Sequence, residues 1–460
     1  MQIPAGKLTF FSLMMINVIA VDSLRNLTVG AEYGYALVFF YLLGALLFFI
    51  PTILVAAELA TGWPNTGGVY VWVREAFGPR AGFMTIWLQW VYNVVWYPTV
   101  FAFIAGIAAY LINPALVNNK VYMLTVILGA FWIATFLNFF GIKTSSILSA
   151  IGAIFGTLFP MVLIAVLGFV WVYNGHHSEI PFKLRNFFPN MGDLSNLAFL
   201  TNILFGLMGM EMSAVHAGDV RNPKKDYPKA LLFSAIIILT TLIFSCLAIA
   251  IVIPVKELNL VSGLMDAFTI FFKTFHLEAF IPILAILIII GSLSGAAAWI
   301  IGPARGLQVA TEDSDLPKML RHLNKRNMPT GILFLQGIIV TLLSLVFLIM
   351  PSVNSSYWVL SNLTAQLALI FYIMMFAAAI RLRYKHAKVD RAFRIPGGKF
   401  GIWLVGGVGI ITCISAIILG FLPPTQIAIG KVASYEAILI LGILIFCVPA
   451  FFIHKKKRIS

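Results

Sequence analysis

Long apolar runs recur along the whole chain, separated by short polar segments. Each run has roughly 20 residues, the length that an α-helix needs to cross the hydrocarbon core of a bilayer. The runs are continuously apolar rather than alternating, which favours helices over the strands of a membrane barrel. The pattern therefore predicts an all-α membrane protein with twelve transmembrane helices. They are expected at 8–30, 35–59, 83–112, 121–140, 147–173, 197–217, 229–254, 279–310, 330–350, 357–381, 401–422 and 434–453.

The composition agrees with this pattern. Hydrophobic residues make up 61% of the 460 residues and charged residues only 10%, whereas soluble domains carry about 25% charged residues. The longest polar stretches, about 176–196 and 311–329, are too short to fold alone. We therefore expect residues 1–460 to form a single membrane domain.

The net charge of +14 is explained by topology rather than by a nucleic-acid surface. Of the 31 Lys and Arg residues, 24 fall in the two termini and in alternate loops, which the positive-inside rule assigns to the cytoplasm. The rule predicts that both termini are cytoplasmic. Because the basic residues are explained in this way, we expect membrane lipid and no nucleic acid as a partner. The other seven are Arg25, Lys120, Lys183, Arg185, Lys256, Lys273 and Lys431.

The sequence offers no set of metal-ligating or catalytic residues. Its three cysteines lie inside apolar runs without ligand spacing, and the adjacent His176 and His177 fall in an outer loop. We see no nucleophile with its base, as an enzyme requires, and no filter sequence, as a channel favours. We therefore expect a protein that is not an enzyme and has no metal or other cofactor.

The first apolar run contains two charges, Asp22 and Arg25, in the segment VDSLR. Charged residues at membrane depth are costly, and by default they mark functional sites. Two interpretations are open. The pair, three residues apart on one helical face, would neutralise itself, or the helix is interrupted here and exposes backbone amides and the Asp22–Ser23 patch to a ligand. We favour the interruption.

The sixth apolar run has a similar feature, with Gly206, Gly209 and Glu211 near its centre. Glycine costs about 1 kcal/mol relative to alanine inside a helix, so two glycines beside a carboxylate favour an unwound turn. Close helix packing through small residues is the alternative. His216, near the inner end of this run, has the chemistry of a proton sensor but is a single histidine.

Several separated motifs resemble those of the amino acid–polyamine–organocation transporters. A Gly- and Pro-rich loop follows Glu58, and the other motifs occur in the family's order and spacing. They read ELATGWPNTGGVYVWVREAFG from Glu58, NPKKDYP from Asn222, WIIGPARG from Trp299, IPGGK from Ile395 and FLPP from Phe421.

This resemblance implies a LeuT-like fold with two inverted halves of five helices, 1–173 and 197–381, followed by helices 11 and 12 within 400–453. It also implies discontinuous helices 1 and 6, alternating access, and a substrate held between the two breaks. Phe205 matches the position of a gating aromatic in relatives. The substrate-binding residues implied are Val21, Asp22, Ser23, Leu24, Arg25, Phe205, Gly206, Met208, Gly209 and Glu211.

Within that family the chain is most similar to the bacterial glutamate/GABA antiporters, which implies a location in the bacterial inner membrane. It departs from them in three ways. Gly295 stands where they have a glutamate, the chain stops at Ser460 without their long cytoplasmic tail, and Asp22 lies where many relatives have a glycine-rich run. We expect Gly295 and Trp299 to line the pathway.

The function predicted from these residues is secondary active transport of an amino acid or amine, most simply by antiport. A proton- or sodium-coupled symporter of neutral or cationic amino acids or amines is the alternative. Residues that would serve the coupling of an ion or proton are Glu211, His216, Ser292 and Ser294.

Overall fold

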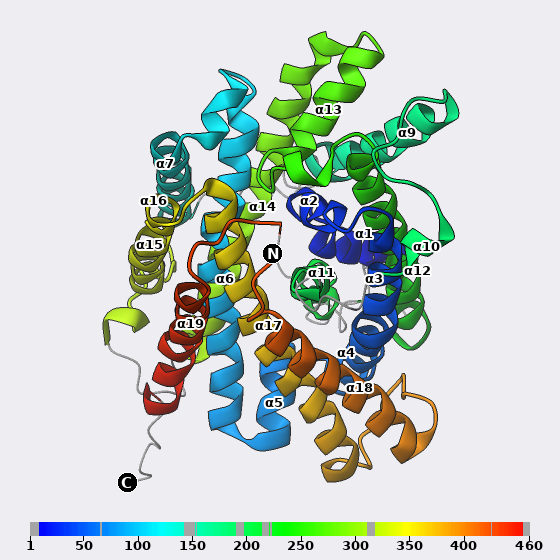
Figure 1. The fold of residues 1–460 in the computed structure, drawn as a ribbon. Helices are drawn as coiled ribbons and strands as arrows, with labels where there is room; N and C mark the ends of the chain where they lie inside the picture. Colours follow the sequence, from blue (N-terminus) through cyan, green and yellow to red (C-terminus); the bar gives the residue numbers. More distant parts are fainter. Residues whose placement is uncertain are drawn as a thin grey trace.

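The computed structural model describes residues 9–64, 67–141, 152, 154–189, 197–213, 220, 223–310, 318–424 and 426–453. These residues form a bundle of α-helices (Figure 1). The first half contains α1 (Phe10–Val21), α2 (Leu27–Ala31), α3 (Leu37–Gly44), α4 (Ile50–Gly62), α5 (Val69–Phe77), α6 (Pro79–Ala109), α7 (Lys120–Phe139), α9 (Phe159–Tyr173) and α10 (Leu184–Phe187). The remainder contains α11 (Leu200–Gly206), α12 (Pro223–Ala250), α13 (Gly263–Thr274), α14 (Ile281–Ala310), α15 (Thr330–Ser344), α16 (Val346–Ile349), α17 (Val353–Lys385), α18 (Gly398–Leu419) and α19 (Val432–Ile453).

Among the described helices, ten are long and apolar enough to cross a membrane, and the bent pair of α1 and α2 makes an eleventh. Their positions follow the apolar runs of the sequence. In the sixth run, the structure describes α11 and the residues up to Ser213, whereas 214–219 lie outside the described part. The twelfth span and the division into two inverted halves therefore stay predictions.

Two long helices form the centre of the bundle. The spans of α6 and α17 are the most buried, at 89% and 78% of their apolar windows, and they pack along each other. Helix α6 also packs against α14, and α17 against α18. Figure 1 shows α11 end on near the middle, between α6 on one side and α1 on the other. Of the two helices expected to be discontinuous, α11 packs against α17 and α1 packs against α12.

The segment after Glu58, which resembles a Gly- and Pro-rich loop of relatives, contains a helix. Residues Val69–Phe77 form a helix, α5, whose Val69, Trp72 and Val73 side chains are buried. Glycines bound the helix at both ends, because Gly68 has a φ of +49° and Gly78 a φ of +99°, backbone angles that residues with a Cβ rarely adopt. These glycines therefore bound the helix rather than prevent it.

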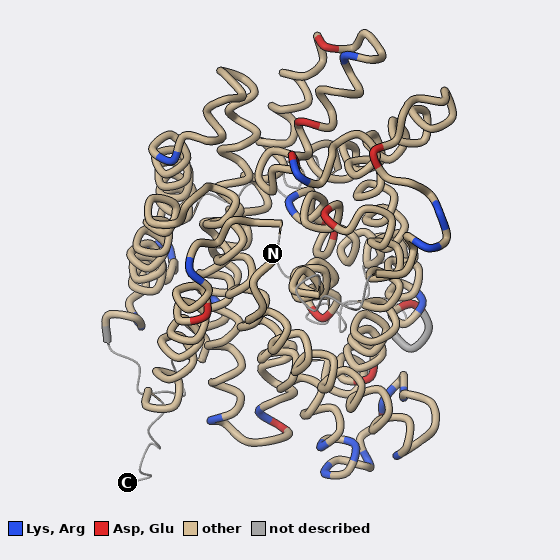
Figure 2. The backbone as a smooth tube through the Cα atoms, in the orientation of Figure 1, with Lys and Arg blue, Asp and Glu red and all other residues tan. Residues whose placement is uncertain are grey.

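Figure 2 marks charged residues both near the middle of the bundle and at the ends of helices. Several Lys and Arg side chains lie at one end, around α5 and the connection from α17 to α18. There, Glu58 at the end of α4 binds Arg383 of α17 through both its oxygens and accepts from the backbone N–H of Ile395 at 2.9 Å. Arg391 completes the cluster, with its Nε 3.6 Å from Glu58.

Candidate substrate cavity

A cavity of about 520 Å³ lies between α1, α6, α11, α14 and α17. Its lining includes Val21, Asp22, Ser23, Leu24, Arg25, Phe205, Met208, Gly209, Glu211, Ser292, Ser294, Gly295 and Trp299. The structure thus brings together nearly all of the residues predicted from the sequence, and their binding role stays a prediction. Gly206 is an exception, since it ends α11 outside the lining and faces Asn26 instead. His216 lies outside the described residues.

The first helix is interrupted at the cavity. Helix α1 ends at Val21, Asp22 and Ser23 adopt extended backbone angles, and a short 3₁₀ turn, η1 (Leu24–Asn26), leads into α2. The two helical parts are bent by 42°. The end of a helix leaves carbonyl groups without helical partners, and the start of the next leaves amide groups. This break therefore presents acceptors from α1 and donors from η1 within a few residues.

The sixth run changes direction at Gly209. Helix α11 ends at Gly206, and Gly209 has a φ of +122°. A Cβ at this glycine would lie 3.0 Å from the carbonyl oxygen of Ala20 and 3.3 Å from Val21 Cγ2. The backbone at Gly209 therefore approaches the C-terminal end of α1 closely. Glycine is required here both for its backbone angle and for the close approach.

A tyrosine of α17 connects this second turn to a carboxylate. The Tyr372 hydroxyl accepts from the backbone N–H of Gly209 at 2.9 Å and donates to Glu211 Oε2 at 2.5 Å. Glu211 is only 3% exposed. Tyr372 itself lines the cavity, so one hydroxyl fixes the unwound backbone and the acidic side chain together.

Arg25 is held in an aromatic cage. Its Nη1 donates to Thr99, Tyr357 and Ser361 at 3.1, 3.3 and 3.4 Å. Its guanidinium carbon lies 5.4 to 5.8 Å from the ring centroids of Trp96, Phe205 and Tyr357. Such cation–π contacts each contribute about 0.5 to 2 kcal/mol, depending on desolvation. They offset part of the few kcal/mol that an arginine costs at membrane depth.

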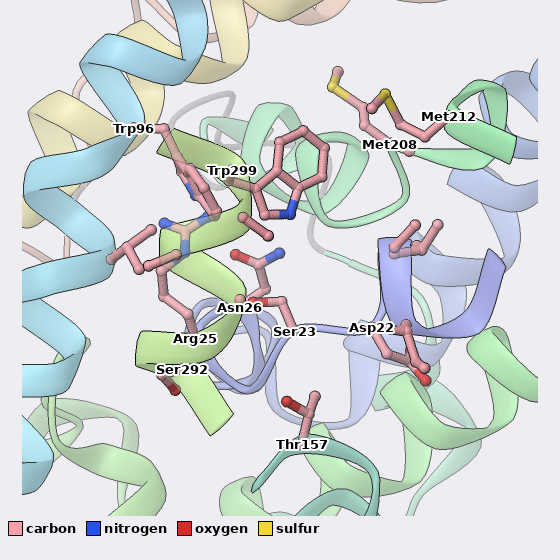
Figure 3. A pocket seen from close by; sticks show the side chains of 18 of the residues that line it. Asp22, Ser23, Arg25, Asn26, Trp96, Thr157, Met208, Met212, Ser292 and Trp299 are labelled. Atoms are coloured by element: carbon pink, nitrogen blue, oxygen red, sulfur yellow. The ribbon is translucent and has the colours of Figure 1, made fainter. Parts of the chain in front are cut away.

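Asp22 turns away from this cage. Its two carboxylate oxygens accept from the Thr241 hydroxyl of α12, at 3.1 and 3.3 Å. Figure 3 shows Asp22 and Arg25 on opposite sides of the break, with Ser23 and Asn26 between them. Within the described chain no ion pair joins Asp22 to Arg25. The self-neutralising pair considered from the sequence is therefore wrong, and the cavity keeps charges of both signs apart.

Helix α14 forms one wall. Trp299 stacks edge to face with Trp96 of α6 at 5.9 Å, and a Cβ at Gly295 would meet no atom within 4 Å. The Ser294 hydroxyl is buried and has no hydrogen-bond partner among the described residues. Thr157 of η5 (Ile154–Leu158) and Ser292 also line this side. The predicted role of Ser292 and Ser294 in ion coupling stays a prediction.

Sequence reasoning missed several lining residues, among them Asn26, Tyr92, Asn93, Trp96 and Tyr372. Asn93 and Trp96 stand three residues apart inside the third run, so they share a helical face, which was an available signal. Tyr372 carried no such signal, because a tyrosine in an apolar helix most often packs.

Among the described residues, no group of three or more His, Cys, Asp and Glu side chains could hold a metal ion.

A second cavity of about 470 Å³ lies beside α13, near the end of α6. Asp266 of α13 accepts hydrogen bonds from the Tyr110 and Ser262 hydroxyls there. Burial raises the pKa of Asp266 above its usual value, and the two hydroxyls oppose that shift. Its lining shares no residue with the first cavity, and the helix breaks lie at the first.

Comparison with known proteins agrees with this arrangement. Residues 8–446 match the family described as amino acid permease. An uncharacterized transporter of Legionella pneumophila is 54% identical over 98% of this chain and 97% of its own. A glutamate/gamma-aminobutyrate antiporter of Lactococcus lactis is 31% identical, covering 98% and 90%. The crystal structure of MhsT in complex with L-phenylalanine superposes with a TM-score of 0.58 at 16% identity, covering 89% of this chain and 98% of MhsT.

Proposed function

The chain belongs to the amino acid permease family, and from that premise we propose that it is an amino-acid antiporter working by alternating access. The family and the fold shared with MhsT make it a multi-pass membrane protein and a secondary amino-acid transporter rather than an enzyme. The finer assignment to exchange is supported by the relative from Lactococcus lactis, which is a glutamate/gamma-aminobutyrate antiporter. Its location would be the bacterial inner membrane.

One observation carries the proposal: the break after Val21 and the turn at Gly209 meet at a single cavity. Transporters of this general design bind substrate near the midplane, at interrupted helices whose ends supply charge-complementary backbone groups. The amides at the start of η1 suit a substrate carboxylate. The carbonyls at the end of α1, together with Asp22 or Glu211, suit the ammonium group.

The same geometry suits rocking of one part of the bundle against the other. In an exchanger only the occupied cavity reorients between the two sides, so each movement outward carries one substrate and each movement inward carries another. We take Phe205, which is half-buried and lines the cavity, as a gate over the site. Alternation between two substrates would then produce exchange.

A second candidate is a proton- or sodium-coupled symporter. The observation that favours it is the buried Ser294 hydroxyl without a partner, beside Ser292 and Thr157 in the same wall. Oxygen ligands of this kind suit a hard cation. This candidate differs from exchange in one measurable way, because symport accumulates substrate only when an ion gradient is imposed.

Counterflow in proteoliposomes tests the two candidates together. Vesicles containing the purified protein are loaded with one unlabelled amino acid at a time, and labelled glutamate is added outside without ion gradients. Uptake that requires an internal amino acid supports exchange. Uptake that requires an imposed proton or sodium gradient favours symport, and protein-free vesicles serve as the control. No transport of any amino acid in either condition would contradict both.

A further inference from the structure

Arg25 is the charged group of the cavity that the mechanism above does not use. Resting on the transporter proposed above, we propose that Arg25 is a specificity-determining residue whose guanidinium binds a carboxylate on the substrate side chain. The substrate class is then an α-amino acid with an acidic side chain. Cationic amines would be rejected, because their second positive charge would face Arg25.

The cage fixes the direction of the guanidinium. All hydrogen bonds that Arg25 makes in the structure leave from Nη1, toward hydroxyls of α6 and α17. Tyr357 also donates to the backbone carbonyl of Arg25 at 3.2 Å. The Nε–H group is buried and has no hydrogen-bond partner among the described residues. A planar guanidinium binds carboxylates through two parallel N–H groups, and no described residue accepts from Nε on that edge.

The charge of Arg25 has no counter-charge in the described part of the chain. The side chain is 4% exposed, and no carboxylate lies within ion-pair distance of it. The two carboxylates that share the cavity are engaged elsewhere, Asp22 with Thr241 and Glu211 with Tyr372. A buried charge without a partner is unfavourable. A carboxylate entering the cavity would supply the missing partner.

The position of Arg25 points to the distal end of a substrate. Figure 3 shows its guanidinium beside Trp96, with Trp299 facing the same space, whereas Asp22 lies across the break. The ends of α1 and η1 already provide carbonyls and amides for the α-ammonium and α-carboxylate groups. Arg25 would therefore bind a third charged group of the substrate, at the aromatic end of the cavity. The indole and phenyl rings there would pack against the aliphatic part of the substrate side chain.

Arg25 also has a structural interpretation, since its hydroxyl contacts join η1 to α6 and α17. The two roles predict different losses. A structural arginine supports every substrate equally, whereas a recognition arginine supports only those with a distal carboxylate. L-Glutamate and L-glutamine are the matched pair of probes, because they share the α-carbon groups and nearly the same shape.

The experiment measures counterflow of labelled L-glutamate and labelled L-glutamine by wild type, Arg25→Gln and Arg25→Lys. Wild type is expected to prefer glutamate. Arg25→Gln should lower glutamate exchange about 10- to 100-fold, the range for loss of a charged hydrogen bond, and leave glutamine exchange within about twofold. Arg25→Lys keeps the charge but lacks the parallel N–H groups of the guanidinium, so its glutamate exchange should lie between that of wild type and that of Arg25→Gln. Ser361→Ala is the matched control, because it removes one support of Nη1 and keeps the preference for glutamate.

Size-exclusion profiles and thermal unfolding in detergent establish that each variant is folded, and glutamate should raise the unfolding temperature of wild type more than glutamine does. Equal losses for both substrates in Arg25→Gln would overturn the proposal and leave Arg25 structural. If wild type exchanges neutral amino acids as well as it exchanges glutamate, and both stabilise it equally against heat, the proposed role of Arg25 is overturned. The proposed antiport function would not be affected by that result. Absence of exchange with any amino acid would instead remove the proposed function on which it rests.

Discussion

At the scale of single residues, Glu211 is one of the two carboxylates proposed to bind the ammonium group of the substrate. It is buried, and Tyr372 donates to it. Glu211→Gln keeps the shape and an acceptor oxygen but removes the charge available to a substrate ammonium. Exchange should fall about 10- to 100-fold, as expected for loss of a charged hydrogen bond, while membrane insertion is unchanged. Counterflow and the amount of protein in the membrane fraction measure the two effects, and wild-type exchange would count against the role of Glu211.

Tyr372 gives a second prediction at this scale. Tyr372→Phe removes the hydroxyl that serves both the N–H of Gly209 and Glu211. Leaving such buried groups without a partner costs about 1 to 3 kcal/mol, so the variant should unfold at a lower temperature and exchange more slowly. Tyr122→Phe is the control, since Tyr122 donates to the carbonyl of Ala105 away from the cavity. Both variants should lose stability, and slower exchange should be confined to Tyr372→Phe.

The charged residues of the cavity could be identified from the sequence, but their partners could not. Asp22, Arg25 and Glu211 stand out because ionisable residues are rare in apolar runs. That Asp22 turns to Thr241 and Arg25 to the aromatic cage depends on which helices pack on either side of the break. The spacing of three residues predicts that Asp22 and Arg25 share one helical face, but this geometry applies only if the helix is continuous.

At the scale of helices, a pair of glycines lets α14 approach η5 closely. A Cβ at Gly291 would lie 2.5 Å from the Cα of Gly156 and 2.6 Å from the carbonyl oxygen of Gly152. Backbone atoms cannot yield as a flexible side chain does, so Gly291→Ala should destabilise the protein by about 1 to 3 kcal/mol. Gly302→Ala on the same helix meets nothing within 4 Å and should be neutral or slightly stabilising. Thermal unfolding in detergent compares them, and equal effects would contradict the close approach.

The ion cluster at the ends of α4 and α17 yields a further prediction. Glu58 has a side-chain exposure of 1%, as does Arg391, and that of Arg383 is 9%. Glu58→Gln leaves both arginines without their carboxylate, and removal of one partner of a buried pair costs about 3 to 5 kcal/mol. Glu75→Gln is the matched control, because Glu75 is 38% exposed in its pair with Arg74 and such pairs contribute about 0 to 1 kcal/mol. Equal unfolding temperatures for the two variants would contradict the prediction.

Helix positions followed from the sequence where apolar length alone decides them, as for α7 (Lys120–Phe139) and α19 (Val432–Ile453). Helix α5 is too short to be identified by the apolar length that marks a membrane span, and it lies between two glycines. Such a short amphipathic segment gains its stability from packing against α6 and α17.

At the scale of the whole molecule, the architecture was the most predictable property. Lipid forces continuous apolar runs to be helical, so composition and run length already define an all-helical bundle. The overall arrangement came from the family resemblance, and the structural similarity to MhsT agrees with it. Apolar periodicity could not give that arrangement, because helices such as α6 are buried on nearly every face and show no polar side to orient them.

The orientation of the bundle gives the last prediction. The excess of Lys and Arg in alternate loops predicts that both termini are in the cytoplasm. A variant without Cys246, Cys413 and Cys447 receives a single cysteine at Asn174 or at Lys388, both exposed. Because residue 174 follows α9 and residue 388 follows α17, the two lie on opposite sides of the membrane in the predicted topology. An impermeant maleimide should label Asn174→Cys in intact cells and Lys388→Cys only after lysis. The reverse result would invert the orientation and place the basic end of Figure 2 outside the cell.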